Sequence, residues 1–343
     1  MGLLARLLGR SDTGGDRRAA AGAPPAGGTA PAADAQGRPR VDPAFGDTDL
    51  ARLRAFAGVG SWPAARAILD TAADQDDLTL MVEAVADVQG AEVSVGKALA
   101  AAPDDPLLQL VQGARHVSWA WEARTRASAR NVTEEQWKTF HERLESAEEH
   151  LYRAAELDPQ LLGPWYFLQI SGRGASLDRD AARNRFEAAL RRSPGHLASH
   201  RQRLQQLCDK WQGSHEQMHA FARRAMLAAP EGSPHGELVA RAHVEHWLAL
   251  PPQEDAAYMG QERVRAELHE AADRSVRHPD YVRGRDWAAT HNEFAMAFAL
   301  AGQPAAANLL FAELGGLATE RPWAYWGDPA EVYQRTRLQC AGH

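Results

Sequence analysis

The middle of the chain repeats a pattern of small, bulky, small and proline residues, A-x3-[LF]-x2-A-x4-P. The copies place these positions at Ala147, Leu151, Ala154 and Pro159; at Ala182, Phe186, Ala189 and Pro194; and, more weakly, at Met218, Ala222, Ala225 and Pro230. Two small residues seven apart let a helix approach its neighbours closely, and the proline ends that helix because it cannot continue the hydrogen-bond ladder. The prolines recur 35 and then 36 residues apart. A period of about 34 is typical of stacked helix–turn–helix units.

The apolar spacing on either side predicts about seven helix pairs over residues 47–320 and a last amphipathic helix within 322–340, with no sheet. The expected helices span 49–58, 62–72, 77–89, 91–102, 106–130, 133–157, 233–250 and 256–277, with further pairs at the central repeats and over 292–311. Thr133 and Gln136 form a capping-box pattern that starts one of the longest helices. Pair three, 106–157, is about 20 residues longer than its neighbours. Such longer helices either project from the solenoid and make specific contacts, or they arise from an insertion that the fold tolerates.

These repeats resemble the second-helix pattern of the tetratricopeptide repeat (TPR) family. A further match lies upstream at Ala91, Val95, Ala98 and Pro103. The family's first-helix pattern is poorly kept, since Trp165 in the segment PWYFL is not followed by the expected glycine. The resemblance implies an all-α, right-handed TPR-like solenoid of about seven helix pairs with a concave partner-binding face, and it implies no chemistry. Residues 210–223 are also similar to a segment of an uncharacterised group of bacterial repeat proteins of unknown function.

Composition narrows the class of protein further. The chain has 343 residues, 45% of them hydrophobic, and a net charge of −7 with both signs interspersed, so nothing indicates general nucleic-acid binding. No apolar run reaches the length of a membrane span. Cys208 and Cys340 lie far apart without metal or redox spacing. We therefore expect free thiols in a reducing, cytoplasmic compartment, in a chain whose composition suits a GC-rich bacterial genome, and no cofactor.

Two regions are expected: residues 1–46 as an N-terminal peptide and linker, and residues 47–343 as the solenoid with its capping helix. Residues 11–46 hold almost no large apolar side chains, so we expect them to be disordered. Residues 1–10, MGLLARLLGR, place four leucines on one helical face. That pattern favours either docking, including docking at a membrane surface, or a frayed terminus.

Residues 215–219, HEQMH, match the H-E-x-x-H pattern of zinc enzymes. On a helix this spacing puts His215 and His219 on one face as zinc ligands, with Glu216 as the general base. The pattern is short and the chain holds 14 histidines, so a chance match is not rare. A zinc-dependent hydrolase is the alternative function that this motif indicates.

A structural explanation of the same stretch competes with zinc binding. Ser214 and Gln217 form a capping box, which places His215 at the first helical position. Metal-binding helices usually hold both histidines well inside the helix. Met218 also occupies the first packing position of the repeat, in register with Ala147 and Ala182, where it would pack inward. We therefore favour a helix start here and expect no bound metal.

The polar faces of the expected first helices offer the preferred functional candidates. Seven residues on them are expected to line a partner-binding groove: His200, Arg203, Arg241, His243, His246, His291 and Asn292. Arginine and histidine beside apolar ridges suit an acidic or carboxylate-ended peptide, although a solvated helix face has the same pattern. We therefore predict a non-catalytic scaffold or adaptor that binds a protein or peptide partner, with an acidic peptide as the candidate.

Overall fold

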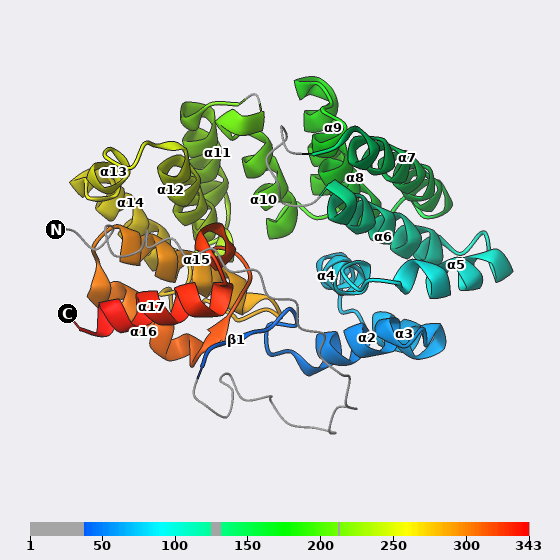
Figure 1. Ribbon diagram of the computed structural model, residues 1–343, viewed down its shortest axis with the longest axis horizontal. Coiled ribbons are helices and arrows are strands. Elements are labelled where there is room, and N and C mark those ends of the chain that lie inside the picture. The colour runs from blue at the N-terminus through cyan, green and yellow to red at the C-terminus, as the bar shows by residue number, and fades with distance from the viewer. Residues whose placement is uncertain (1–37, 125–131, 212, 343) are drawn as a thin grey trace. The chain divides into compact units, whose positions relative to one another are not determined.

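The computed structural model describes residues 38–124, 132–211 and 213–342, and α-helices dominate it (Figure 1). Within these residues there are 16 α-helices and one pair of two-residue strands. Within each compact unit, most consecutive helices pack against one another in sequence order. The all-α fold of packed helix pairs expected from the sequence is therefore confirmed. The expected peptide at residues 1–10 and the linker up to residue 37 lie outside the described residues.

The chain forms two compact units, which divide the region expected as one solenoid. The N-terminal unit, Asp49–Ala229, is built from α2 (Thr48–Gly58), α3 (Trp62–Leu69), α4 (Gln75–Ala86), α5 (Ala91–Ala101), α6 (Pro106–Arg124), α7 (Glu134–Leu157), α8 (Gly163–Gly174), α9 (Arg179–Leu190), α10 (Leu197–Gln206), the 3₁₀ helix η2 (Asp209–Trp211) and α11 (His215–Ala228). The C-terminal unit joins residues up to Thr48 to those from Pro230 onward: β1 (Arg40–Val41), η3 (Pro234–Gly236), α12 (Glu237–Ala249), α13 (Asp255–Met259), α14 (Glu262–Asp273), α15 (Trp287–Leu300), α16 (Pro304–Leu314), β2 (Leu317–Ala318), η4 (Trp323–Trp326) and α17 (Pro329–Ala341).

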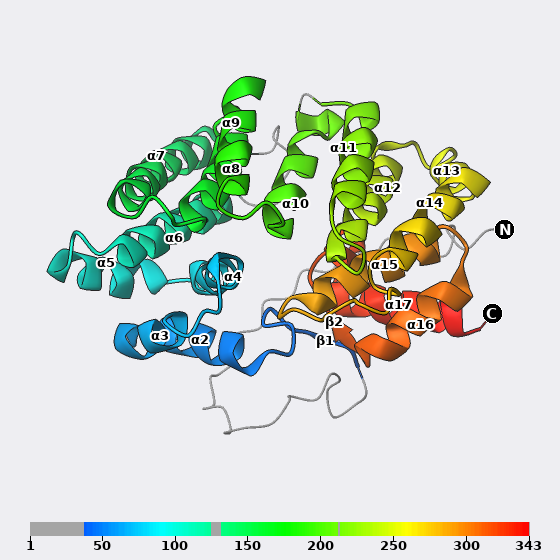
Figure 2. The ribbon, with the colours of Figure 1, turned by 180° about the vertical axis from the view of Figure 1, so that it is seen from behind.

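Small residues set the spacing between helices in the N-terminal unit. Ala147, Leu151 and Ala154 of α7 are fully buried, as the repeat pattern predicts. The hairpin of α6 and α7 brings Ala147 and Leu151 onto Gly113, and the two helices lie side by side in Figures 1 and 2. A Cβ atom at Gly113 would come within 2.7 Å of the Leu151 side chain. Glycine is therefore required for this close approach.

The start of α7 confirms the predicted capping box. The Thr133 hydroxyl accepts a hydrogen bond from the Gln136 backbone N–H at 3.2 Å, and the Gln136 side-chain oxygen accepts one from the Thr133 N–H at 2.9 Å. The helix ends at Leu157, just before Pro159, as the proline rule predicts. The partner helix α6 is described to Arg124, and residues 125–131 of the predicted helix lie outside the described residues.

A short parallel strand pair corrects two expectations, the absence of any sheet and a disordered linker up to residue 46. Strand β1, near the start of the described chain, pairs with β2, which lies near its end. Asp42, only 4% exposed, follows β1, and its carboxylate accepts a hydrogen bond from the Gly46 N–H at 3.1 Å. Residues 40–46 therefore belong to the C-terminal unit. Their backbone groups find distant partners, which composition alone does not reveal.

Aromatic side chains close the end of the C-terminal unit. Trp323 of η4 is fully buried, and its ring contacts Phe311 of α16 and Tyr333 of α17. The Trp323 indole N–H donates to the side-chain oxygen of Asn292 at 2.6 Å. Because the indole has a polar partner, its whole ring can be buried at little cost. These contacts hold α17 against α16.

Candidate functional site

The seven candidate groove residues lie on three helices of the two units. They are His200 and Arg203 on α10 of the N-terminal unit, and Arg241, His243 and His246 on α12 and His291 and Asn292 on α15 of the C-terminal unit. Arg203 and His246 keep partial exposure, and the other five are buried. The structure thus brings together two separate sets of candidates, one in each unit.

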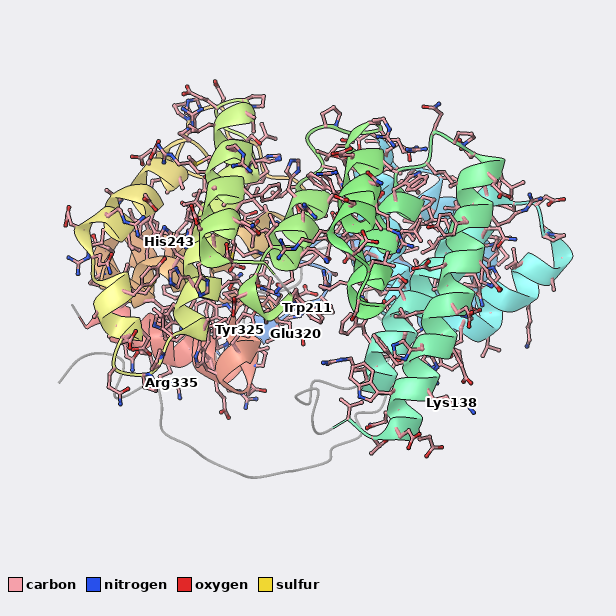
Figure 3. The ribbon with its side chains drawn as sticks, turned by 90° about the horizontal axis from the view of Figure 1, so that it is seen from above. Lys138, Trp211, His243, Glu320, Tyr325 and Arg335 are labelled. Atoms are coloured by element: carbon pink, nitrogen blue, oxygen red, sulfur yellow. The ribbon has the colours of Figure 1, made fainter. Side chains whose placement is uncertain are left out.

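On α12, the candidate histidines contact their own chain. The Nδ1 atom of His243 lies 2.7 Å from the Tyr258 hydroxyl, and its Nε2 atom lies 3.0 Å from the Glu267 carboxylate. The ring of His246 lies 4.1 Å, centroid to centroid, from the Tyr258 ring. Figure 3 labels His243 among the side chains of this unit. Both ring nitrogens of His243 are therefore engaged within the C-terminal unit.

On α15, both candidates are held inside the unit as well. His291 is fully buried, and its ring nitrogens lie 3.0 Å from the Trp287 carbonyl and 3.1 Å from the Glu313 carboxylate. Burial lowers the pKa of His291, with the Glu313 charge acting in the opposite direction. The side chain of Asn292 donates to the Leu317 carbonyl at 3.1 Å, which ties α15 to β2. These polar groups stabilise the fold of the unit.

Arg241 lies in a buried network of charges. Its guanidinium contacts the carboxylate of Glu237 at 2.9 Å and that of Glu293 at 3.2 Å. Thr290 donates a further hydrogen bond to Glu237 at 2.7 Å. Burial raises the pKa of Glu293, and the attraction of Arg241 counteracts that effect. The charge of Arg241 is thus neutralised internally, as is usual for a structural arginine.

The N-terminal unit presents a different arrangement between α10 and α11. An open pocket of about 390 Å³ lies there, lined by Arg203, Leu207, Glu216, Gln217, Ala220, Phe221 and Arg224. The pocket brings two guanidinium groups and one carboxylate next to an aromatic ring. Its local charge is therefore positive, although the whole chain carries −7.

Arg203 is the unusual residue of this pocket. Burial lowers the pKa of its guanidinium, and the nearby Arg183 lowers it further, while Glu187 acts in the opposite direction. In the part of the chain that the structure describes, Arg203 and Arg224 make no ion pair with a carboxylate within 4.0 Å. A partly desolvated guanidinium without an acid is costly to maintain. Such a group gains most from a ligand that supplies the missing negative charge.

An aromatic wall supports the pocket. The Phe221 ring stacks on His200 at 6.0 Å between centroids and contacts the Phe186 ring at 5.8 Å. Burial lowers the pKa of His200, whose Nδ1 atom lies 3.0 Å from the His196 carbonyl. His200 is therefore neutral near pH 7 and acts as part of the wall. The two candidates on α10 thus contribute in different ways, one as a ring in the wall and one as a cation.

The HEQMH stretch starts the helix that forms one side of this pocket. Helix α11 begins at His215, and the Ser214 hydroxyl accepts a hydrogen bond from the Gln217 N–H at 3.2 Å. Met218 is fully buried, as the repeat register predicts. A Cβ atom at Gly213 would lie 2.0 Å from the Leu207 carbonyl oxygen, so the chain needs glycine to turn from α10 into α11.

His215 and His219, with Glu216 between them, thus occupy the first turns of α11. Within residues 38–124, 132–211 and 213–342, no three His, Cys, Asp or Glu side chains gather as a metal site needs. Cys208 and Cys340 are both buried free thiols, as their spacing predicts. No helix in the described part of the chain has the length and apolar character to cross a membrane.

The sequence identified Arg203 but missed Arg224 and Leu207 as pocket residues. Arg224 lies three positions after Phe221 on α11, so both project from one face of the helix. That spacing could have been recognised. Which face of α10 meets them depends on the turn at Gly213, and a single sequence does not reveal this packing.

Comparisons with known proteins add little to the geometry. No protein-family model matches the chain, and no curated protein matches it. Among solved structures, the chain is similar to the crystal structure of yeast Tom70, with 14% sequence identity and a TM-score of 0.33. The alignment covers 88% of this chain and 64% of the Tom70 chain, so this chain spans less than two thirds of that protein. The assignment to an all-α fold of helix pairs rests on the packing described above.

Proposed function

We propose that this protein is a non-catalytic scaffold that binds an acidic protein or peptide segment in the pocket between α10 and α11. The observation that carries the proposal is the pair Arg203 and Arg224, which face the pocket without a carboxylate partner in the described chain. A guanidinium presents a planar fork of donors that matches a carboxylate, and the partial burial of Arg203 strengthens the attraction. Asp or Glu side chains of the partner would supply the missing charge.

The lining also indicates what surrounds the acid in the partner. Phe221 and Leu207 offer apolar surface beside the two arginines. A partner segment with an apolar residue next to the acidic one would fill both parts of the pocket. The single carboxylate, on Glu216, lies in the first turn of α11, where the helix dipole already favours it. Binding would therefore depend on ionic strength, because part of its free energy is electrostatic.

Fluorescence anisotropy tests this proposal with the intact chain. The probes are fluorescein-labelled dodecapeptides that pair Glu or Asp with Leu or Phe, together with the same peptides carrying Gln or Asn. We expect the acidic peptides to bind and the neutral ones to bind at least about tenfold more weakly, since a hydrogen bond to a charged group contributes roughly 1.5–3 kcal/mol.

Arg203→Gln should weaken binding of the acidic probes by about 10- to 100-fold. Lys138→Gln is the matched control, because Lys138 is an exposed cation of α7 in the same unit (Figure 3). It should bind as the wild type does. Equal binding of acidic and neutral peptides, or equal loss in both variants, would overturn the proposal.

A further inference from the structure

The outer face of α17 carries a second surface, independent of the acid-binding pocket. Glu331, Gln334, Arg335, Leu338 and Gln339 line an open hollow of about 510 Å³, and these five residues are called the α17 face. Leu338 is 60% exposed, which is unusual for a large apolar side chain in the C-terminal unit. Arg335 is labelled in Figure 3.

The α17 face also has unused hydrogen-bonding capacity. The side-chain oxygens of Gln334 and Gln339 and the Nε and Nη2 atoms of Arg335 are buried without a hydrogen-bond partner in the described part of the chain. Most buried polar groups in proteins do have a partner. The described part of the chain thus leaves polar atoms of three neighbouring α17 residues without a hydrogen-bond partner.

A segment of the same chain can reach this face. Strand β1 lies beside α17, so the described chain begins, at residue 38, close to the helix. Residues 11–37 connect that point to residues 1–10. A random coil of this length has an end-to-end distance of roughly 30 Å. The 13 residues of α17 extend over about 20 Å, which is within that reach.

We propose that residues 1–10 dock on the α17 face. Their leucines, at positions 3, 4, 7 and 8, share one face at helical spacing and would cover Leu338 and the stem of Arg335. Arg6 and Arg10 lie on the same short segment and complement the carboxylate of Glu331. The α17 face lies on the helix that follows the last helix pair.

Residues 1–10 of the same chain have an advantage over a second copy of the protein in binding to the α17 face. A random-coil link of this length gives an effective concentration in the millimolar range. Protein solutions used for measurement are usually far more dilute. Docking within one chain therefore prevails even when the intrinsic affinity is weak, and it should not depend on protein concentration.

Trypsin cleavage of the full chain after Arg6 and Arg10 tests the proposal. Cleavage requires the undocked segment, so its rate follows the open population. We expect Leu338→Glu to accelerate cleavage at both sites by at least about threefold, which corresponds to a segment docked in more than two thirds of the wild-type molecules. Leu309→Glu is the matched control, because Leu309 is equally exposed on α16 and lies outside the α17 face. It should be cleaved at the wild-type rate.

Leu8→Glu changes the segment instead of the face, and it should accelerate cleavage after Arg10 as strongly as Leu338→Glu does. Circular dichroism would establish that all the variants are folded. Wild-type cleavage as fast as that of a free peptide of residues 1–16 overturns the proposal. Protection that disappears on dilution, together with a dimer in light scattering, also overturns it, because the cover would then be a second copy.

Vesicles containing anionic phosphatidylserine provide a further test. If docking on α17 holds the leucines, Leu338→Glu should increase vesicle binding by the full chain, and Leu309→Glu should not. Equal vesicle binding by the wild type and Leu338→Glu overturns the proposal, because residues 1–10 would then be free in both proteins.

Discussion

Arg115 on α6 and Arg203 on α10 belong to the same unit and differ in their partners. The guanidinium of Arg115, 1% exposed, contacts the Glu92 carboxylate at 2.7 Å and the Glu122 carboxylate at 2.7 Å. Burial alone would lower the pKa of Arg115, but the hydrogen bonds that its guanidinium donates to these two acids raise it. Arg203 has no such acid, and burial lowers its pKa.

Arg115 and Arg203 illustrate two roles of an arginine that is at least partly removed from solvent. A guanidinium enclosed by carboxylates stabilises the fold, and its removal leaves those acids without a partner. A guanidinium that is partly desolvated and has no acid contributes little to folding and is available to a ligand. Arg185 on α9 belongs to the first kind, since Glu148 contacts its guanidinium through both carboxylate oxygens at 2.8 Å. Four measurements would break or sharpen this distinction.

The largest effect is expected from Arg115→Met. This change removes a buried cation and leaves Glu92 and Glu122, both partly exposed, without it. We expect a loss of about 3 kcal/mol in the free energy of unfolding, at the lower end for a buried ion pair because water can reach the acids. Urea denaturation measures it. Arg153→Met, at an exposed position on α7, should change the value by less than about 0.5 kcal/mol. Similar losses in both variants would remove the distinction.

The excess of carboxylates around Arg241 predicts a pH-dependent effect of Glu293→Gln. Burial raises the pKa of Glu293, so the folded state holds its proton to higher pH than the unfolded state. The resulting stability is complete below about pH 4.5 and is lost as the pH rises through the folded-state pKa. The side-chain amide that replaces the carboxyl in this variant does not titrate.

The variant Glu293→Gln should therefore gain stability relative to the wild type as the pH rises between about pH 5 and pH 8. Urea denaturation at several pH values measures the difference between the two proteins. A difference that does not change with pH would mean that Glu293 is charged in the folded state throughout this range.

The next largest effect on stability is expected from removing the N-terminal cap of α11. Ser214→Ala should cost about 1 kcal/mol in the free energy of unfolding, because the first turn of α11 loses an acceptor. His219→Ala should cost less than about 0.5 kcal/mol. A chelator should leave the Tm of the wild type unchanged, and metal analysis should find no stoichiometric zinc. If the wild type held one equivalent of zinc and His219→Ala lost it, the zinc-hydrolase function would be favoured over the scaffold function.

The smallest effect on stability is expected from Arg203→Met. Since no carboxylate in the described chain forms an ion pair with Arg203, the change should leave the free energy of unfolding within about 0.5 kcal/mol of the wild type or raise it. The same variant should lose binding of the acidic peptides. Calorimetric Tm values beside anisotropy titrations would show the two effects in one protein. A loss of stability similar to that of Arg115→Met would make Arg203 a structural residue.

Local residue patterns predicted most of the helices. Ala147, Leu151 and Ala154 are buried as their spacing indicates, and Thr133 caps α7 as its sequence predicts. These features depend on residues within one or two turns of each other. The pairing of β1 with β2 was missed because two residues hold no alternating pattern and their partners lie at the other end of the chain.

The candidate site was only partly predictable for a related reason. Arg203 and Arg241 occupy similar polar positions on first helices, and the sequence gives no basis for telling them apart. Their difference arises from acids on other elements, such as Glu293 on α15, which closes the network around Arg241. Helix periodicity indicates a polar face but does not show what packs against it.

The strand pair of residues 40–41 and 317–318 sets an order for events during synthesis. In the sequence, all residues of the N-terminal unit come after β1 and before β2, so they leave the ribosome before β2 does. Its helices can complete their contacts while β1 still lacks its partner. Asp47 likewise waits for Arg285, 238 residues later, and at about 5–20 residues per second that delay is on the order of tens of seconds. Residues 40–47 can thus reach their final contacts only after the whole N-terminal unit has been made.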